Sequence, residues 1–172
     1  MKTSFKYVKR WYLEMKEAPQ HSEIVFPENI TIVRFSGNTD DYRQLNRLVG
    51  GDLGWVDRQI MKDEELEKIL NNSGNRIFVL FNSQQPVGFA ELDFMNNGEV
   101  EMHYFGLVPV ARGKGLGKPF LQWTIAEVWK SNPSKLILNT CEIDHPGALP
   151  MYLKAGFTIV AERIEKQAVL SE

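Results

Sequence analysis

The densest group of residues able to bind an anion lies between residues 106 and 118. The sequence there reads Gly-Leu-Val-Pro-Val-Ala-Arg-Gly-Lys-Gly-Leu-Gly-Lys, so glycines alternate with other residues and basic side chains stand among them. Glycines leave backbone N–H groups unobstructed, and at the N-terminus of a helix these groups carry a partial positive charge. Arg112, Lys114 and Lys118 add positive charge beside them. The stretch predicts a pyrophosphate-binding turn between a strand and a helix.

The spacing of the glycines excludes two common nucleotide-binding motifs. A dinucleotide-binding turn needs G-x-G-x-x-G, whereas Gly113, Gly115 and Gly117 give G-x-G-x-G. A P-loop needs Gly-Lys followed by Ser or Thr, and neither Gly-Lys pair of this turn is followed by one. The alternative is a plain turn that starts a helix and carries solvated basic residues, which the regular alternation of glycines disfavours.

This turn resembles the acetyl-CoA motif of the GNAT superfamily of N-acetyltransferases. Residues 112–117 are similar to its R/Q-x-x-G-x-G/A pattern, and Pro109 matches a proline that often precedes it. A second block, residues 145–157, resembles the family's N-x-x-A-x-x-L-Y-x-x-x-G-F, with His145 in place of the asparagine. The two blocks follow each other in the expected order, and the resemblance covers about residues 30–162.

The resemblance implies acetyl-CoA as co-substrate and assigns roles around it. The implied cofactor-binding set joins the end of a strand, the turn, the start of a helix and the replaced asparagine: Gly106, Leu107, Val108, Arg112, Gly113, Lys114, Gly115, Leu116, Gly117, Lys118 and His145. Backbone N–H groups of residues 112–117 would hold the pyrophosphate, and Gly106 and Leu107 would bond the pantetheine arm. Tyr152 matches the family's general acid near the sulfur, and the alternative is a packing tyrosine on a short helix.

Direct attack by an amine also requires that the amine be neutral. Family members often place a carboxylate or histidine base four or six positions before the residue that matches Leu107, which are His103 and Glu101 here. Strand alternation puts both on one face, with Tyr104 and Gly106 on the other, unless a bulge breaks the count. Imidazole titrates near neutrality, while a glutamate could act through water. A polar cross-strand pair on a half-exposed face is an equal alternative.

The acceptor amine is expected at the connection between the first two helices, where the family usually builds this pocket. Trp55, Asp52 and Asp57 would offer an aromatic ring and two carboxylates to a cationic amine. A solvated loop capped by a packing tryptophan is equally compatible. The lone cysteine, Cys141, is expected to be a small buried residue rather than a nucleophile. The three histidines lack metal-ligand spacing, so no metal is predicted.

The elements that must position these residues form a mixed pattern. Alternating and β-branched runs predict strands at residues 10–15, 30–35, 76–81, 87–94, 99–108, 135–140 and 157–162. Helical spacing predicts helices at residues 42–49, 63–70, 116–130 and 148–154. The Asn-Asn-Gly turn at residues 96–98 predicts a hairpin within an antiparallel meander. The fold class is therefore α+β, and the resemblance implies a mainly antiparallel central sheet, flanked by helices and splayed between the strands that end near Leu107 and Cys141.

Composition limits the remaining choices. The chain has 172 residues, of which 43% are hydrophobic and 24% charged, which predicts one domain over residues 1–172, with residues 1–29 as an extension packed on it. The net charge of −2 shows no basic excess, so no nucleic-acid partner is expected. Apolar runs are far shorter than the ~20 residues that span a bilayer, and no signal-like segment is seen, so the expected location is cytoplasmic with no membrane contact.

The expected function is that of an acetyl-CoA-dependent N-acetyltransferase. Its acceptor would be a small-molecule amine or a protein amino group, and a homodimer is one expected assembly. The alternative is a non-catalytic module of the same fold that binds or senses an acyl-CoA. Tyr152, with Glu101 and His103 beside the cleft, favours catalysis.

Overall fold

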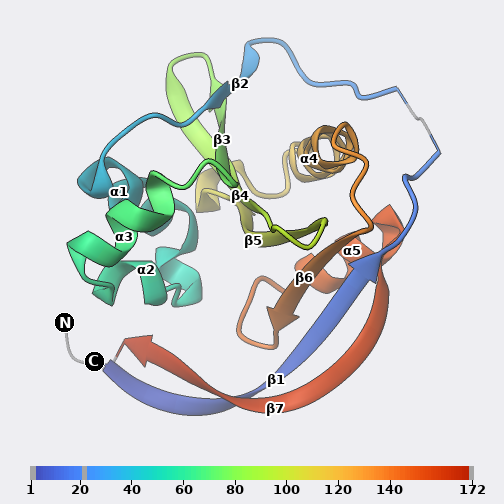
Figure 1. Cartoon of the computed structure of the whole chain (residues 1–172). Coiled ribbons are helices and arrows are strands. Elements are labelled where there is room, and N and C mark those ends of the chain that lie inside the picture. Colours follow the sequence, from blue (N-terminus) through green and yellow to red (C-terminus); the bar gives the residue numbers. More distant parts are fainter. Residues whose placement is uncertain (1–2, 21–22, 171–172) are drawn as a thin grey trace.

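A computed structural model describes residues 3–20 and 23–170, and it places helices on both faces of one central sheet (Figure 1). The strands are β1 (Thr3–Met15), β2 (Ile30–Arg34), β3 (Asn75–Asn82), β4 (Gln85–Phe94), β5 (Glu99–Leu107), β6 (Lys135–Cys141) and β7 (Thr158–Leu170). The helices are α1 (Thr39–Gly50), α2 (Asp57–Ile60), α3 (Asp63–Leu70), α4 (Gly117–Trp129) and α5 (Ala148–Ala155), with short 3₁₀ turns η1 (Gly51–Leu53) and η2 (Pro109–Ala111). In this part of the chain no helix is long and apolar enough to cross a membrane.

The sheet has the strand order β2-β3-β4-β5-β6-β1-β7. Every neighbouring pair is antiparallel except β5 and β6, which are parallel. The predicted meander is confirmed as β3, β4 and β5, and the predicted α+β class with a mainly antiparallel sheet is confirmed as well. The amino-terminal segment is part of this sheet, because β1 lies between β6 and β7.

The last two strands of the sheet order, β1 and β7, which are called the outer strands below, are much longer than their sequences indicate. β1 pairs with β6 only from Arg10 to Met15, whereas its pairing with β7 begins at Thr3. Residues 3–9 and 164–170 therefore form a two-stranded arm that curves away beneath the rest of the sheet (Figure 1). Their sequences carry little apolar alternation, so each becomes a strand chiefly because the other is there to pair with it.

The first helix shows how local sequence fixes an element that later frames the site. Asn38 caps α1 by accepting a hydrogen bond from the N–H of Asp41, and Asp41 accepts one from the N–H of Asn38 in return. Tyr42, Leu45 and Val49 recur at helical spacing and are buried against the sheet. Burial of each such side chain contributes about 1.5–3 kcal/mol, which holds α1 to its face.

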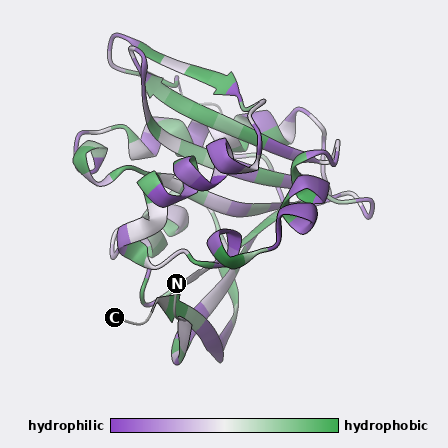
Figure 2. Ribbon diagram, turned by 90° about the vertical axis from the view of Figure 1, so that its left-hand side faces the viewer, coloured by the Kyte–Doolittle hydropathy of each residue, from purple (hydrophilic) through white to green (hydrophobic). Residues whose placement is uncertain are grey.

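The core lies on both faces of the meander, where the central strands are hydrophobic and the outer turns of the helices are hydrophilic (Figure 2). On the α1 face, the Phe89 ring meets the Tyr42 ring edge-on, with centroids 6.1 Å apart. On the α4 face, the Phe105 ring stacks on Phe120 at 5.0 Å. Since both faces are packed, β4 and β5 form the rigid centre from which the site projects.

The sheet opens between its two parallel strands, as predicted. The ladder between β5 and β6 runs only from the pair Glu99 and Lys135 to the pair Met102 and Leu138. Beyond it, residues 104–107 pair only with β4. Residues of β6 from 139 onward likewise pair only with β1. The backbone edges that face each other across this splay are therefore available to a ligand.

A bulge in β5 changes which side chains share a face. Glu91 of β4 pairs with Tyr104, and Leu92 pairs with Met102, so His103 is one residue too many on β5. Two residues then oppose one, and the alternation of faces is interrupted at this point.

The bulge corrects the face prediction made for this strand. Tyr104 was expected opposite Glu101 and His103, but all three point to the face covered by α1, α2 and α3. Strict alternation would also put Phe105 on the face of His103, but Phe105 faces α4, where it stacks on Phe120. Alternation alone fails here because a bulge leaves no mark in the pattern of residue types.

Candidate active site

A cavity of about 440 Å³ opens at the splay between β5 and β6. Its walls come from both strands, from the connection that follows α1, and from the beginnings of α4 and α5. The site residues predicted from sequence that line it are Trp55, Asp57, His103, Gly106, Leu107, Arg112, Gly113, Gly117, His145 and Tyr152. Those outside its lining are Asp52, Glu101, Val108, Lys114, Gly115, Leu116 and Lys118.

The glycine turn between β5 and α4 has the backbone shape that its sequence suggests. Gly113 has φ +71° and Gly115 has φ +78°, in the left-handed region that side chains with a Cβ rarely adopt. A Cβ built at either position would meet no atom within 4 Å, so open space adjoins the turn. Leu116, which precedes α4, provides no side-chain cap for the helix. The first N–H groups of α4 thus face an open space suited to an anion.

The side chains around this turn divide into two kinds. Lys114 and Lys118 are exposed and carry their charges beside the open turn. Leu116 and Val108 are buried, and the N–H of Val108 donates to the carbonyl of Val87 at 2.9 Å. These two residues anchor the turn in the core, while the lysines remain available to a phosphate.

Arg112 holds the turn against α1. Its guanidinium donates to the carbonyl oxygens of Leu107 at 3.0 Å and Val49 at 2.8 Å, and to both carboxylate oxygens of Asp52. The hydrogen bond from Arg112 lowers the pKa of the Asp52 carboxyl, and the positive charge adds to this effect. Asp52, expected to face an acceptor amine, is thus paired with Arg112 outside the cavity lining.

Trp55 forms one wall of the cavity. A Cβ at Gly50 would lie 2.1 Å from its ring, so the glycine at the end of α1 is what allows the indole to approach. The ring packs against Tyr104 at 5.0 Å, and its Nε1 donates to Asp144 Oδ1 at 3.2 Å. The connection after α1 is therefore fixed from both sides of the splay, by Arg112 and by Asp144.

Asp144, which sequence reasoning did not single out, orders the loop after β6. Its Oδ2 atom accepts hydrogen bonds from Thr140 Oγ1 at 2.8 Å and from the N–H of Cys141 at 3.0 Å. The Cys141 thiol lies 3.6 Å from the same oxygen. Burial raises the pKa of this thiol, and the negative charge of Asp144 raises it further. Cys141 is therefore protonated near neutral pH, as suits the structural cysteine expected from sequence.

Tyr152 lies on α5 at the cavity wall. Its ring packs against Phe105 at 6.4 Å and against Phe157 at 5.9 Å, which fixes its orientation. Within the described residues its hydroxyl has no hydrogen-bond partner. Burial raises the pKa of the phenol well above its usual value, with a smaller effect from the charge of Asp144. The hydroxyl is thus a protonated donor at neutral pH, free to bond a ligand.

The two predicted base candidates lie together at the bulge. His103 lines the cavity, with Nε2 3.6 Å from Asp93 Oδ2 and Nδ1 3.8 Å from Glu101 Oε1. Glu101 flanks the imidazole but does not itself line the cavity. His145, in place of the family's asparagine, lies at its rim and accepts a hydrogen bond from the N–H of Gly147 at 3.0 Å.

A buried ion pair that sequence reasoning missed supports the wall of the cavity that contains Trp55 and Tyr104. Glu91 is fully buried and accepts hydrogen bonds from Arg58 at 2.7 Å and from the Tyr42 hydroxyl. The Arg58 guanidinium lies over the Tyr104 ring, 5.6 Å from its centroid, and burial raises the pKa of that phenol. A carboxylate inside the apolar run of residues 87–94 was the signal that could have revealed the pair, because a buried charge requires a partner.

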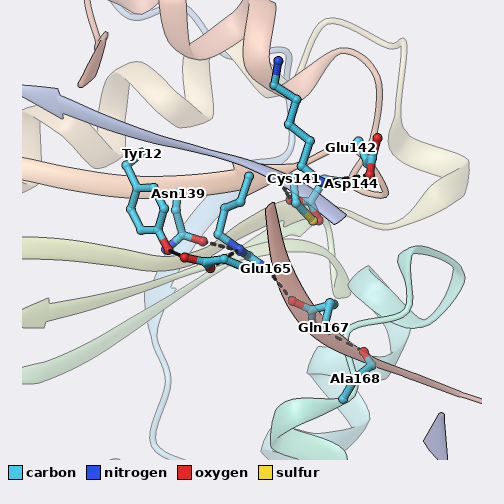
Figure 3. A network of polar contacts seen from close by, with 10 residues as sticks. Tyr12, Asn139, Cys141, Glu142, Asp144, Glu165, Gln167 and Ala168 are labelled. Atoms are coloured by element: carbon cyan, nitrogen blue, oxygen red, sulfur yellow. Dashed lines mark hydrogen bonds and ion pairs between the residues drawn. The ribbon is translucent and has the colours of Figure 1, made fainter. Parts of the chain in front are cut away.

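A polar cluster from three strands forms the opposite part of the lining. Arg10 of β1, Asn139 of β6 and Gln167 of β7 all line the cavity. Figure 3 shows Asn139 and Gln167 within one network that also includes Tyr12 and Glu165. No local motif marks these residues, since they meet only when the outer strands pair. Among the described residues no group of three His, Cys, Asp or Glu side chains is arranged to hold a metal ion.

Comparison with known proteins gives the same reading of the fold. Residues 42–157 match the family model described as "Acetyltransferase (GNAT) family". Mycothiol acetyltransferase of Corynebacterium efficiens is 32% identical over 87 residues, which are 51% of this chain and 29% of that protein. The chain therefore matches less than a third of the length of this curated relative.

Solved structures agree in fold at low sequence identity. A GCN5-related N-acetyltransferase from Sphaerobacter thermophilus superposes with a TM-score of 0.66 at 17% identity, over 94% of this chain and 51% of that one. An aminoglycoside acetyltransferase from an uncultured soil metagenomic sample superposes with a TM-score of 0.60 at 18% identity, over 74% and 88% of the two chains. The family model matches more than half of the sequence, and the solved structures share the fold. This chain belongs to the GNAT family of acetyltransferases.

Proposed function

We propose that the protein is an acetyl-CoA-dependent N-acetyltransferase that transfers the acetyl group to a primary amine by direct attack. The observation that carries the proposal is the hydroxyl of Tyr152 in the wall of the cavity at the splay, which has no hydrogen-bond partner in residues 3–20 and 23–170. A module that only bound an acyl-CoA would need the splay and the glycine turn, but it would not need a protonated donor held free in the cavity.

The chain's own groups fit acetyl-CoA along the whole opening. The turn at Gly113 and Gly115 and the uncapped start of α4 supply N–H groups and open space for a pyrophosphate, with Lys114 and Lys118 beside them. The unpaired edge of residues 103–107 can bond an extended pantetheine arm as if it were another strand. Acetyl-CoA, when bound, supplies an acetyl group activated as a thioester.

The acceptor side of the cavity suits an amine. Asp57 lines it, and its carboxylate forms no ion pair within the described part of the chain. Trp55 and Tyr104 place aromatic faces nearby, so a cationic amine can be drawn in and oriented. His103 would then take a proton from the amine, and the carboxylates of Asp93 and Glu101 would stabilise the imidazolium that results.

In the transfer, the amine nitrogen forms a bond to the acetyl carbon, and the carbon–sulfur bond breaks. His103 takes the first proton, from the ammonium, and the second proton, lost from nitrogen as the amide forms, ends on the departing thiolate beside Tyr152, so that CoA leaves as its thiol. Because the pKa of Tyr152 is raised above its ordinary value, whereas a thiol ordinarily titrates near 8.5, complete proton transfer from the phenol to the thiolate is uphill. Tyr152 would therefore contribute mainly by donating a hydrogen bond as negative charge develops on sulfur.

The proposal is tested first by calorimetric titration with acetyl-CoA and CoA, and then by thiol release with a panel of amines. We expect tight binding of acetyl-CoA and release of thiol that depends on an amine. Binding without thiol release from any primary amine, including amines that lack a carboxylate, would favour the non-catalytic module instead.

The base is tested separately through the pH dependence of turnover. If His103 accepts the amine proton, His103→Ala should lower turnover and remove the ascending limb of the pH–rate profile. Glu101→Gln should leave that limb in place and shift it only slightly, since Glu101 acts on the imidazole. An ascending limb unchanged in both variants would mean that the amine arrives neutral and that the protein supplies no base.

A further inference from the structure

The polar cluster of Arg10, Asn139 and Gln167 is unused by the proposed chemistry, although all three residues line the cavity. Arg10 Nη1 donates to Asn139 Oδ1, and Nη2 donates to Gln167 Oε1. Its Nε lies 3.4 Å from Glu165 Oε2, outside the cavity lining. The Arg10 side chain is 16% exposed, so the surrounding strands hold it in place.

This arrangement presents hydrogen-bond donors to the cavity. A guanidinium has five N–H donors and no acceptor, and three of the five are directed to Asn139, Gln167 and Glu165. One N–H on each terminal nitrogen remains. Because arginine can only donate, both amides must turn their oxygens toward it, which leaves their NH₂ groups for other partners. Asn139 Nδ2 has no hydrogen-bond partner in the described part of the chain.

The strand register places the cluster on the acceptor side of the sheet. Asn139 lies two residues beyond Ile137, so both point to one face, and Ile137 pairs with Glu101. Glu101 shares its face with His103 and Tyr104 because of the bulge. The cluster thus shares the cavity with the acceptor side chains, on the face opposite the one that carries α4 and its phosphate-binding start.

Two residues of the lining, Asp57 and Arg10, carry opposite charges on different walls of the cavity, whereas the other arginines and aspartate of the lining (Arg58, Arg112 and Asp144) are bound to partners within the chain. Asp57 and the aromatic wall lie on the side of α2, while Arg10 lies on the side of the outer strands. The carboxylate that balances Arg10, Glu165, is held behind it and accepts a hydrogen bond from the Tyr12 hydroxyl at 2.7 Å. A planar anion that reached the two N–H groups of Arg10 left over by these partners could accept a hydrogen bond from each of them, and the Nδ2 group of Asn139 is a further donor nearby.

We infer that the acceptor carries a carboxylate as well as its amine, and that Arg10, with Asn139 and Gln167, selects it by binding this carboxylate. The inference rests on the proposed function and names its substrate class: a small amino acid or a similar amino-carboxylate, rather than a polyamine or a protein side chain. Arg10 is thus a specificity-determining residue contributed by the amino-terminal strand.

Matched pairs of acceptors test the inference. Thiol release from acetyl-CoA is measured with glycine, serine, leucine, lysine and phenylalanine, each compared with its own carboxamide. We expect kcat/KM of the native protein for the best amino acid to exceed that for its carboxamide by about tenfold or more, as one good charge-assisted contact allows. Arg10→Met should remove this preference by lowering the value for the acid while changing that for the amide less than about twofold.

A second variant tests the same inference independently, in case Arg10→Met does not fold. Gln167→Glu keeps an oxygen for Arg10 but sets a negative charge against the guanidinium, so the preference for the acid should vanish with the fold intact. Lys166→Met removes a cation from the next residue of β7, whose exposed side chain lies over the Phe5 ring on the outer face. That control should keep the native preference.

The outcomes separate the inference from the proposed function. If carboxamides and simple amines are acetylated with the same kcat/KM as the amino acids, the inferred carboxylate site is wrong. The same holds if Arg10→Met retains the preference for the acid. Neither result contradicts the proposed transferase activity. If no amine causes release of thiol, the proposed transferase activity is wrong, and the carboxylate site is then tested by ligand binding alone. N-acetyl-leucine is then titrated against N-acetyl-leucine amide with CoA present. Tighter binding of the acid that Arg10→Met abolishes supports the site, and equal binding overturns it.

Discussion

The role of a residue at this site depends on which of its hydrogen-bonding groups are not already used by partners within the chain. Arg112 and Arg10 are both arginines of the cavity lining, yet Arg112 is bound to Asp52 and two carbonyls, whereas Arg10 keeps N–H groups for a ligand. Tyr104, which is partly buried, and Tyr152, which is buried, both have a raised phenol pKa, but Tyr104 lies under a guanidinium whereas Tyr152 lines the cavity at the splay. Residue type alone does not separate these roles, because the partners are distant in sequence.

Replacing Tyr152 with phenylalanine tests the donor without disturbing its packing. Tyr152→Phe keeps the ring between Phe105 and Phe157, so affinity for acetyl-CoA should change little. Turnover at saturation should fall by about 10²-fold, since the thiolate loses its hydrogen bond. Because burial raises the pKa of the phenol above its usual value of 10, its deprotonation should produce no descending limb below pH 10. Native turnover in this variant, with chemistry rate-limiting, would exclude the role.

The pair of Asp52 and Arg112 should contribute stability that depends on pH. The folded pKa of Asp52 is lowered, so its contribution is present above the unfolded value of 3.8 and is lost as the pH falls through the folded pKa. Asp52→Asn should lower the free energy of unfolding by about 0.5–1 kcal/mol at pH 7, since the carboxylate is partly exposed. In urea unfolding the difference should shrink progressively as the pH is lowered below 3.8. Glu17→Gln, at an exposed carboxylate without an ion pair in the described chain, serves as control and should show no such pH dependence.

At the scale of elements, sequence reasoning succeeds where the signal is local. The strand–turn–helix at residues 106–118 and the meander of β3, β4 and β5 follow from glycine spacing, alternation and a hairpin turn. It fails where one element depends on another. The bulge at His103 is seen only in the pairing of β5 with β4, and the four-residue helix α2 is too short to show a periodicity.

The glycine turn offers a prediction with a close control. Gly115→Asp and Gly98→Asp both put a side chain on a glycine of positive φ, +78° and +84°, with no atom within 4 Å of the new Cβ. Each should cost stability by a similar amount, about 1 kcal/mol, because the backbone strain is alike. Only Gly115→Asp should abolish acetyl-CoA binding in calorimetry, since it adds a negative charge where phosphates are expected. Equal affinity in the two variants would place the pyrophosphate elsewhere.

At the scale of the whole molecule, the outer strands β1 and β7 contribute residues both to the hydrophobic core and to the cavity wall that contains Arg10. β1 supplies Arg10 to the cavity and, three residues on, Leu13 to the core, where that side chain is 1% exposed. The arm formed by residues 3–9 and 164–170 has an outer face with Phe5 and Tyr7 exposed and an inner face with Val8 buried. The acceptor side is therefore built from segments at opposite ends of the sequence.

Two substitutions in β1 separate its inner and outer faces. Leu13→Ala should lower the free energy of unfolding by about 2–5 kcal/mol, because it leaves a cavity between β1 and the core. Tyr7→Ala, on a side chain that is 74% exposed, should change it by less than about 0.5 kcal/mol. Urea unfolding followed by circular dichroism measures both. Similar losses in the two variants would contradict the burial pattern of this strand.

The position of β1 between β6 and β7 also sets an order of events in folding. Arg10 bonds to Asn139 and Gln167, which lie 129 and 157 positions further along the chain. Contacts of such long range form slowly, because the intervening chain must first be brought together. We therefore expect β1 to remain unpaired, with its apolar side chains exposed, while the meander and α4 assemble. During that interval it is open to capture by other chains or by chaperones. In refolding from denaturant, the circular dichroism signal of the β-sheet should therefore recover first. The preference for an amino acid over its carboxamide should recover later, because Arg10 is on the strand that we expect to pair last.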